Sequence, residues 1–205
     1  MIDLSKKVPY QYQGDSTNRS QAWRSCFSSS CAMLAEAVKP GCLRDALTRA
    51  GRQLDDFYRE TLEGLRVGDT TEYTAQLATL RHFCPGFNFS FVTNADTHTI
   101  QGQLQLGIPV PMGILHHGPL DAPSGGGHWI CCVGWEGNDN GRLIVHDPAG
   151  ELDVRNGGYI DSRATAGKAV RYGAETLRRR WELDDARRFS VGHGWAIIAR
   201  QDKSK

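Results

Sequence analysis

One segment near the N-terminus constrains the fold of this chain more than any other. Between residues 26 and 38, four side chains recur at the spacing of one helical face: Phe27, Cys31, Leu34 and Val38. Most of the other positions are serine or alanine, so neighbouring elements can pack closely against several sides of this segment. Lys39-Pro40-Gly41 then ends the pattern. The segment therefore predicts a buried helix over residues 26–38.

Cys26 lies in the predicted first turn of this helix. Unpaired N–H groups and the positive end of the helix dipole meet there, and both favour the thiolate form of a cysteine. Cysteine is also a common buried residue, and Cys31, on the apolar face, is expected to be a packing residue of that kind. A catalytic interpretation of Cys26 therefore depends on a base and an orienting group elsewhere in the chain.

The rest of the pattern changes character near residue 87. Helices are predicted over 42–50, 69–83 and 96–106, a basic helical segment over 174–181, and 53–65 is ambiguous. Strands are predicted over 88–92, 110–115, 128–135, 142–146 and 195–199. Helices first and antiparallel strands second predict an α+β fold. We expect one domain over residues 1–205 with two lobes, mainly helical over about 1–86 and mainly β over 87–205.

Charge and hydropathy exclude several classes of protein. The formal net charge is +1, so no nucleic-acid partner is expected from charge alone. The basic run Arg178-Arg179-Arg180-Trp181 is followed by Glu182, Asp184 and Asp185, so it is interpreted as a solvated face with Trp181 in the core. No apolar run has the length of a membrane span, and the first residues lack the apolar centre of a secretory signal. We therefore expect a chain that is cytoplasmic at synthesis.

The cysteines do not suggest a metal site. Neither a CxxC pair nor a Cys/His cluster with zinc spacing appears among the six cysteines at positions 26, 31, 42, 84, 131 and 132. Reduced, separate thiols are the expected state, with Cys131 and Cys132 packing on opposite faces of one strand. No metal and no organic cofactor are expected.

Two residues of the predicted sheet complete a nucleophile site. His128 opens a strand behind Gly125-Gly126-Gly127, and Asp147 closes the next strand. Antiparallel pairing of the two strands brings both side chains to the same end of the hairpin, where the carboxylate can orient the imidazole. Gln13 is the candidate side-chain donor to an oxyanion beside the Cys26 N–H, with Gln11 as the alternative.

Three further histidines are less informative. His116 and His117 lie in the glycine-rich loop before His128, where they either line a cleft or are ordinary exposed loop residues. His146 adjoins Asp147 and should point to the other face of the strand, so a structural role is favoured.

The motifs occur in a recognisable order. They are Val8-Pro9-Tyr10-Gln11-Tyr12-Gln13, then Cys26 with Ala32-Met33, then Gly126-Gly127-His128-Trp129, then His146-Asp147-Pro148. In this order the chain resembles the bacteriocin-processing (double-glycine) peptidase-like family of papain-fold cysteine peptidases, which includes phage and bacterial members. The resemblance implies a papain-like fold with the nucleophile on an N-terminal helix and an antiparallel sheet after it. It also implies catalytic roles for Gln13, Cys26, His128 and Asp147.

Two features depart from the family pattern. Phe27-Ser28 follows the cysteine where relatives often have Gly-Pro or Asn-Val, and the interval from Gln13 to Cys26 is long. Phage-type members suggest a peptidoglycan endopeptidase of lysin or tail type, delivered to the wall by a holin or a virion. A general or leader-peptide protease, a non-catalytic papain-fold binding module, and transglutaminase or amidase chemistry on the same triad are the alternatives. The oligomeric state is left open.

Overall fold

A computed structural model describes residues 1–138, 140–181 and 194–202. Its helices are α1 (Cys26–Val38), α2 (Ala46–Arg49), α3 (Leu54–Leu65), α4 (Tyr73–Phe83), α5 (Thr97–Gln105) and α6 (Ala174–Arg178). Two short 3-10 helices, η1 (Gln13–Asp15) and η2 (Ala22–Arg24), precede α1. Its strands are β1 (Ile2–Asp3), β2 (Phe87–Ala95), β3 (Val110–Ile114), β4 (His128–Glu136), β5 (Arg142–His146), β6 (Glu151–Leu152), β7 (Tyr159–Asp161), β8 (Val170–Gly173) and β9 (Gly194–Gln201).

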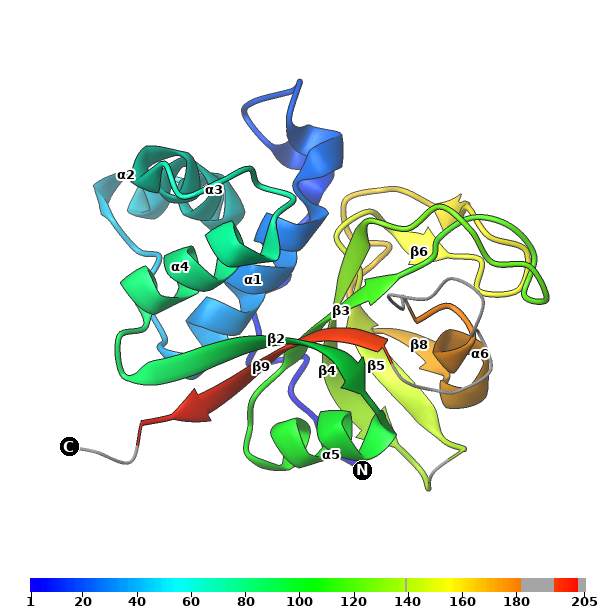
Figure 1. The fold of residues 1–205 in the computed structure, drawn as a ribbon. Coiled ribbons are helices and arrows are strands. Elements are labelled where there is room, and N and C mark those ends of the chain that lie inside the picture. The colour runs from blue at the N-terminus through cyan, green and yellow to red at the C-terminus, as the bar shows by residue number, and fades with distance from the viewer. Residues whose placement is uncertain (139, 182–193, 203–205) are drawn as a thin grey trace.

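A seven-stranded antiparallel sheet forms the centre of the molecule. Its strand order is β2-β9-β3-β4-β5-β8, and β1 pairs with part of β4. Helices α1 to α4 lie on one side of Figure 1, whereas β6, β8 and α6 lie on the other, with the central strands between them. β6 and β7 form a separate two-stranded ribbon. The predicted α+β architecture, with helices before an antiparallel sheet, is confirmed.

Helix α1 packs between the sheet and the other N-terminal helices. It contacts β4 and β3 on one side and α3 and α4 on the other, and its residues from 26 to 36 are all buried. Its serine-rich middle explains this position, because small side chains allow close approach on several faces. Two of the buried hydroxyls make hydrogen bonds: Ser29 Oγ donates to Asp55 at 2.6 Å, and Ser28 Oγ accepts from Gln76 Nε2 at 3.1 Å. These two hydrogen bonds partly offset the free-energy cost of burying polar side chains on this helix.

Most predicted elements are found, and the differences have local causes. The helix predicted over 42–50 shortens to α2, because Gly41, Cys42 and Leu43 form a turn before the Asp45 side chain caps the helix through Thr48 N. The ambiguous segment 53–65 forms α3. β1, β6, β7 and β8 were not predicted, since strands of two to four residues are too short to show a clear alternation.

The interpretation of residues 178–181 as a solvated face is wrong for Arg180. Its side chain is 0% exposed and donates to four backbone carbonyls, those of Val154, Leu115, His117 and Gly118, at 2.7–3.1 Å. A guanidinium carries five N–H donors, so it can replace its hydration shell with carbonyl groups from several loops. Trp181 is buried as predicted, whereas Glu182, Asp184 and Asp185 lie outside the described residues.

Replacing Arg180 should destabilise the fold strongly. Arg180→Ala removes a donor from four carbonyls, of which His117 O keeps a second donor in Ser124 N, and we expect the free energy of unfolding to fall by about 3–5 kcal/mol. Arg179→Ala is the matched control, because Arg179 is exposed and lies 3.9 Å from the carboxylate of exposed Glu175. Chemical denaturation of both variants measures the difference. Equal stabilities would contradict the structural role of Arg180.

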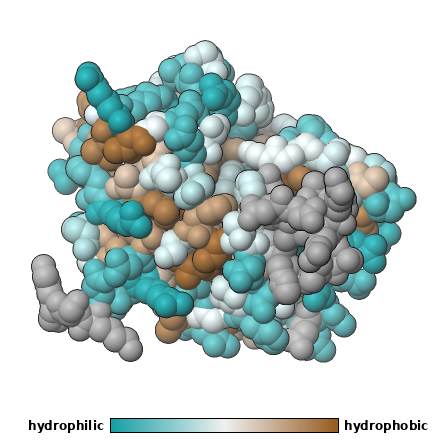
Figure 2. Space-filling model, in the orientation of Figure 1, coloured by the Kyte–Doolittle hydropathy of each residue, from teal (hydrophilic) through white to brown (hydrophobic). Residues whose placement is uncertain are grey.

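Figure 2 shows small, separate hydrophobic areas among hydrophilic residues on the face it presents. Within the described ranges, no helix is both long enough and apolar enough to cross a bilayer.

Candidate active site

Three predicted site residues lie at the ends of secondary-structure elements that converge. Cys26 begins α1, His128 begins β4, and Asp147 directly follows β5. The register of the β4–β5 pair places Cys131 opposite His146, so the start of β4 and the end of β5 share one edge of the sheet. All three side chains are buried, with exposed fractions of 6%, 5% and 0% for Cys26, His128 and Asp147.

The imidazole of His128 lies between the carboxylate and the thiol. Its Nε2 is 2.9 Å from Asp147 Oδ1, and its ring is also hydrogen-bonded to Cys26. Because Nε2 faces the carboxylate, Nδ1 is the nitrogen left for the sulfur. The Cys26 thiol further donates to the carbonyl of Gly127 at 3.5 Å. The structure therefore brings the nucleophile, base and orienter candidates together.

Charge controls the protonation of His128. Burial alone lowers the pKa of this imidazole, but the Asp147 charge, its hydrogen bond and the hydrogen bond with Cys26 outweigh burial and raise the pKa to about 10. Asp147 Oδ1 is fixed by a second hydrogen bond, from Ala149 N at 3.0 Å. His128 is thus an imidazolium at neutral pH, and an imidazolium beside a sulfur stabilises a thiolate.

An aromatic stack joins the residues next to the thiol and the imidazole. Phe27 and Trp129 lie ring on ring, with centroids 3.6 Å apart and planes 3° apart. Phe27 follows Cys26 on α1, and Trp129 follows His128 on β4. The stack therefore fixes the start of the helix against the start of the strand. This is what Phe27 contributes at a position where the resembled family often has a glycine or an asparagine.

The N-terminal segment places Gln13 beside the Asp147 turn. Three contacts follow in order along the chain. Val8 O lies 3.2 Å from His146 Nε2, Tyr10 Oη donates to Asp147 O at 2.9 Å, and Gln13 N donates to Pro148 O at 3.0 Å. η1, which begins with Gln13, also packs against η2, which immediately precedes Ser25 and Cys26. Gln13 therefore lies between the end of β5 and the approach to the nucleophile.

The side chain of Gln13 is buried with an unpaired oxygen. It is 3% exposed, and its Oε1 has no hydrogen-bond partner among the described residues. Gln11, the alternative, already donates its Nε2 to Pro9 O and Tyr10 O at 3.4 and 3.0 Å. Exchanging the oxygen and nitrogen of the Gln13 carboxamide would put its N–H₂ group at that unpaired position, whereas Nε2 of Gln11 already bonds local carbonyls. The oxyanion role of Gln13 stays a prediction.

The long interval between Gln13 and Cys26 is held by α3. Asp56 accepts hydrogen bonds from Ser16 Oγ at 2.5 Å and from Thr17 N and Oγ1 at 2.8 Å. The additional residues are therefore anchored rather than free to displace Gln13.

Substituting the two glutamines tests the assignment. In Gln13→Ala, we expect kcat for amide hydrolysis to fall by about 10²-fold or more with little change in KM, because an oxyanion donor acts mainly in the transition state. Gln11→Ala should retain kcat, since its carboxamide bonds only nearby backbone carbonyls. Steady-state kinetics on one peptide substrate measure both variants, and a larger loss in Gln11→Ala would reverse the assignment.

Comparison with known proteins identifies the fold. A crystal structure from Bacillus anthracis, described as a C39-like peptidase, matches with a TM-score of 0.55 over 98% of this chain and 98% of its own, at 13% sequence identity. The fold is that of the C39-like, papain-type peptidases. The peptidase domain of Streptococcus ComA, a bi-functional ABC transporter involved in a quorum-sensing pathway, matches with a TM-score of 0.48 over 88% of this chain and 93% of that domain, at 15% identity. No protein-family model and no curated protein match the sequence.

These identities are low, so the similarity concerns the fold, and the chemistry has to be argued from the side chains. A papain-type fold places a helix N-terminus beside the edge of an antiparallel sheet, as α1 and β4 lie here. Among the residues that the structure describes, no group of three or more His, Cys, Asp or Glu side chains is arranged to hold a metal ion.

The other histidines separate into two environments. His146 is fully buried and bonds backbone groups at both ring nitrogens, Val8 O and Ala169 N, which fits the expected structural role. His116 packs its ring 5.3 Å from that of His128, and burial, followed by the charge of His128, lowers its pKa to about 4. His116 is therefore a neutral neighbour of the site, whereas His117 pairs with Ser124 across the loop.

Tyr159 is a site neighbour that the sequence analysis missed. It lies on β7, its ring meets that of His128 edge-on at 5.8 Å, and its hydroxyl is buried without a partner among the described residues. Burial, then the charges of Asp147 and Cys26, raises the pKa of this phenol, so it stays a neutral donor. The turn residues Gly157-Gly158 just before it were the available signal of a short hairpin.

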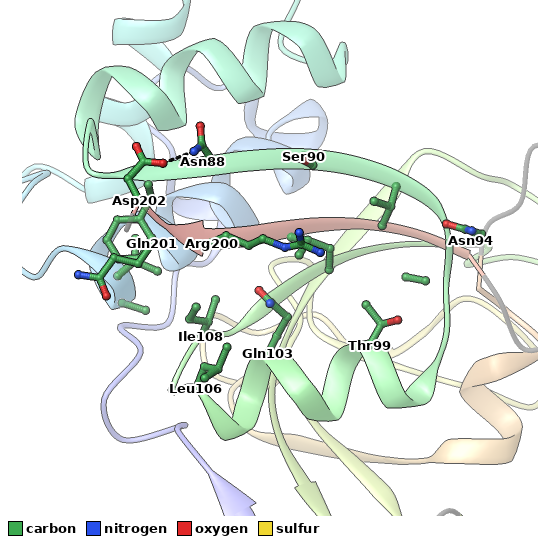
Figure 3. A pocket seen from close by; sticks show the side chains of 17 residues that line it. Asn88, Ser90, Asn94, Thr99, Gln103, Leu106, Ile108, Arg200, Gln201 and Asp202 are labelled. Carbon is green, nitrogen blue, oxygen red and sulfur yellow. Dashed lines mark hydrogen bonds between the residues drawn. The ribbon is translucent and has the colours of Figure 1, made fainter. Parts of the chain in front are cut away.

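A large groove lies away from the thiol. It has a volume of about 1490 Å³ and is bordered by β2, β9, α5 and the C-terminal end of α1, whereas Cys26 begins that helix. Figure 3 shows Gln103 and Thr99 of α5 facing the strands, and Arg200 of β9 lying across the space. The groove therefore does not form part of the candidate active site.

Proposed function

We propose that this protein is a cysteine-type endopeptidase that hydrolyses amide bonds through Cys26, His128 and Asp147. The observation that carries the proposal is the His128 ring, hydrogen-bonded at 2.9 Å to buried Asp147 and at its other side to a thiol that begins a helix. This is the nucleophile–base–orienter arrangement of acyl-transfer enzymes. The papain-type fold supports the same reaction class.

Acylation follows from the geometry. The Cys26 thiolate attacks the carbonyl carbon of the scissile amide, while Asp147 holds the imidazolium of His128 through Nε2. The resulting oxyanion accepts hydrogen bonds from the Cys26 backbone N–H and from the Gln13 side chain. The C–N bond then breaks as His128 gives its Nδ1 proton to the leaving amine, and a thioester remains on Cys26.

Deacylation reverses the role of the imidazole. Neutral His128 takes a proton at Nδ1 from a water molecule, whose oxygen attacks the thioester carbonyl. The C–S bond breaks, the product leaves as a carboxylic acid that gives its proton to the solvent, and the thiolate–imidazolium pair is restored. The charge of Asp147 stabilises the imidazolium at both stages.

For the substrate, we propose the peptide cross-links of peptidoglycan, with the enzyme acting as a phage lysin or a tail-associated enzyme and reaching the wall through a holin or a virion. This step rests on the resemblance of the sequence motifs to phage-type members of the family. It goes beyond the proposal of cysteine peptidase chemistry, and a failure of the substrate proposal leaves the chemistry standing.

Two assays on the same preparation test both levels. Purified cell walls should lose turbidity and release fragments with new amino groups and no new reducing sugar ends. Casein or a peptide library digested in parallel would instead reveal a protein-directed protease. Absence of hydrolysis in every assay, together with alkylation of Cys26 no faster than that of a free thiol, would show a non-catalytic module.

A further inference from the structure

Two cysteines meet at the end of α1 that is far from Cys26. Cys42 lies in the turn after the helix, and Cys84 directly follows α4 as its C-cap residue. Both are free, and their side chains are close enough for each to shift the pKa of the other. Cys84 Sγ also lies 3.7 Å from Ala35 O, in the last turns of α1. Neither cysteine belongs to the proposed active site.

The backbone holds both thiols in place. Glu36 is buried, and its carboxylate accepts from Gly41 N at 2.9 Å and from Leu43 N at 2.7 Å, so it fixes the turn on both sides of Cys42. Lys39 Nζ donates to Phe83 O at 3.0 Å and joins that turn to the end of α4. These bonds bring the turn that carries Cys42 up to the end of α4 that precedes Cys84, and a disulfide forms without much distortion only where the two backbones are already close.

The two thiols also shift each other's pKa in opposite directions. The hydrogen bond from Cys42 lowers the pKa of Cys84, burial opposes this, and the charge of Lys39 lowers it further. In the same contact, the pKa of Cys42 is raised, first by the hydrogen bond with Cys84 and then by burial. The contact therefore favours a thiolate in this pair, and half-buried Cys42 is the member that solvent reaches.

We propose that Cys42 and Cys84 form a reversible redox pair, which a hydroperoxide oxidises to a disulfide that ties the end of α1 to the end of α4. One thiol attacks a peroxide oxygen, the O–O bond breaks, and a sulfenic acid and an alcohol or water result. The second sulfur then attacks the sulfenic sulfur, the S–S bond forms, and water leaves. Two electrons pass from the sulfurs to the peroxide, and a dithiol reductant returns them.

The oxidation is tested on the full chain in the Cys26→Ala background, so that the proposed nucleophile does not consume peroxide. The protein is reduced, treated with hydrogen peroxide, unfolded, alkylated and mapped as peptides without reductant. We expect a Cys42–Cys84 cross-link, two thiols protected from alkylation, and their recovery after dithiothreitol. Adding Cys42→Ser should abolish both the cross-link and the protection.

Cys31→Ala is the matched control, because Cys31 is also a thiol of α1 but packs in the core. This variant should still form the cross-link. Oxidised protein should melt about 10 °C higher than reduced protein, because the disulfide closes a long loop of the unfolded chain. Equal thiol protection in Cys42→Ser, a cross-link to any other cysteine, or an unchanged melting temperature after cross-linking would overturn the proposal. None of these readouts needs peptidase activity.

Discussion

Cys26→Ala should abolish amide hydrolysis while leaving the fold intact. Removing the nucleophile leaves no group able to form the thioester, so we expect kcat/KM to fall by about 10⁴-fold or more. The side chain is small and its Sγ contacts His128 and Gly127 O, so the loss in packing is slight. Hydrolysis of the best substrate found, measured with the melting temperature, tests both parts.

Cys31→Ala is the control for this result. Cys31 lies on the same helix, is fully buried, and has its pKa raised by burial to a value at which the thiol stays protonated at neutral pH. Its removal should cost about 1–2 kcal/mol of stability and leave kcat unchanged. Full activity in Cys26→Ala, or loss of activity in Cys31→Ala alone, would place the nucleophile elsewhere.

Replacing Asp147 should separate the effect of its hydrogen bond from that of its charge. Asp147→Ala removes both and leaves the Nε2–H of His128 buried without an acceptor, so kcat should fall by about 10²–10⁴-fold. Asp147→Asn keeps an acceptor oxygen and removes the charge. The fall in kcat of Asp147→Asn should therefore depend on pH.

The sign of this dependence follows from the pKa of His128. In the folded protein this pKa is about 10, against an ordinary value of about 6.5. The stabilisation from the charged imidazole is complete below about pH 6.5 and is lost as the pH rises through about 10. In Asp147→Asn, the upper limit of activity and this stabilisation should both move down towards pH 6.5.

The pH–rate profile of kcat/KM and the pH dependence of unfolding measure the shift. Asp153→Asn is the matched control, because Asp153 caps its own turn through Arg155 N and Asn156 N and does not contact His128. Its profile should match that of the wild type. An upper limit that stays in place in Asp147→Asn would show that the carboxylate does not set the protonation of His128.

Local patterns in the sequence predicted the elements that carry the site. The apolar repeat of 26–38 and its Lys39-Pro40-Gly41 end gave the bounds of α1, and alternation gave β4 and β5. Because β4 and β5 are joined by a short hairpin, their pairing also predicted that His128 and Asp147 lie at the same edge. The α+β class followed from the order of the elements.

What the sequence could not give depends on contacts between distant segments. The burial of Arg180 requires carbonyls of residues 115, 117, 118 and 154, and no local pattern shows that these loops surround one guanidinium. Tyr159 reaches His128 from a three-residue strand. The meeting of Cys42 and Cys84 was likewise hidden, since the two residues are separated by the whole of α2, α3 and α4.

The contacts of residues 8–13 with the end of β5 have a consequence for folding. Tyr10 bonds Asp147 across 137 positions of the sequence, and Gln13 bonds Pro148 in the same way. Contacts of such long range form after a large loss of chain entropy, so they belong to the slow part of folding. During synthesis, Cys26 leaves the ribosome first, and His128 and Asp147 follow only after more than 100 further residues have been made. We therefore expect hydrolytic activity to appear only as folding finishes, later than the helical signal, which would keep an immature peptidase silent inside the cell that makes it.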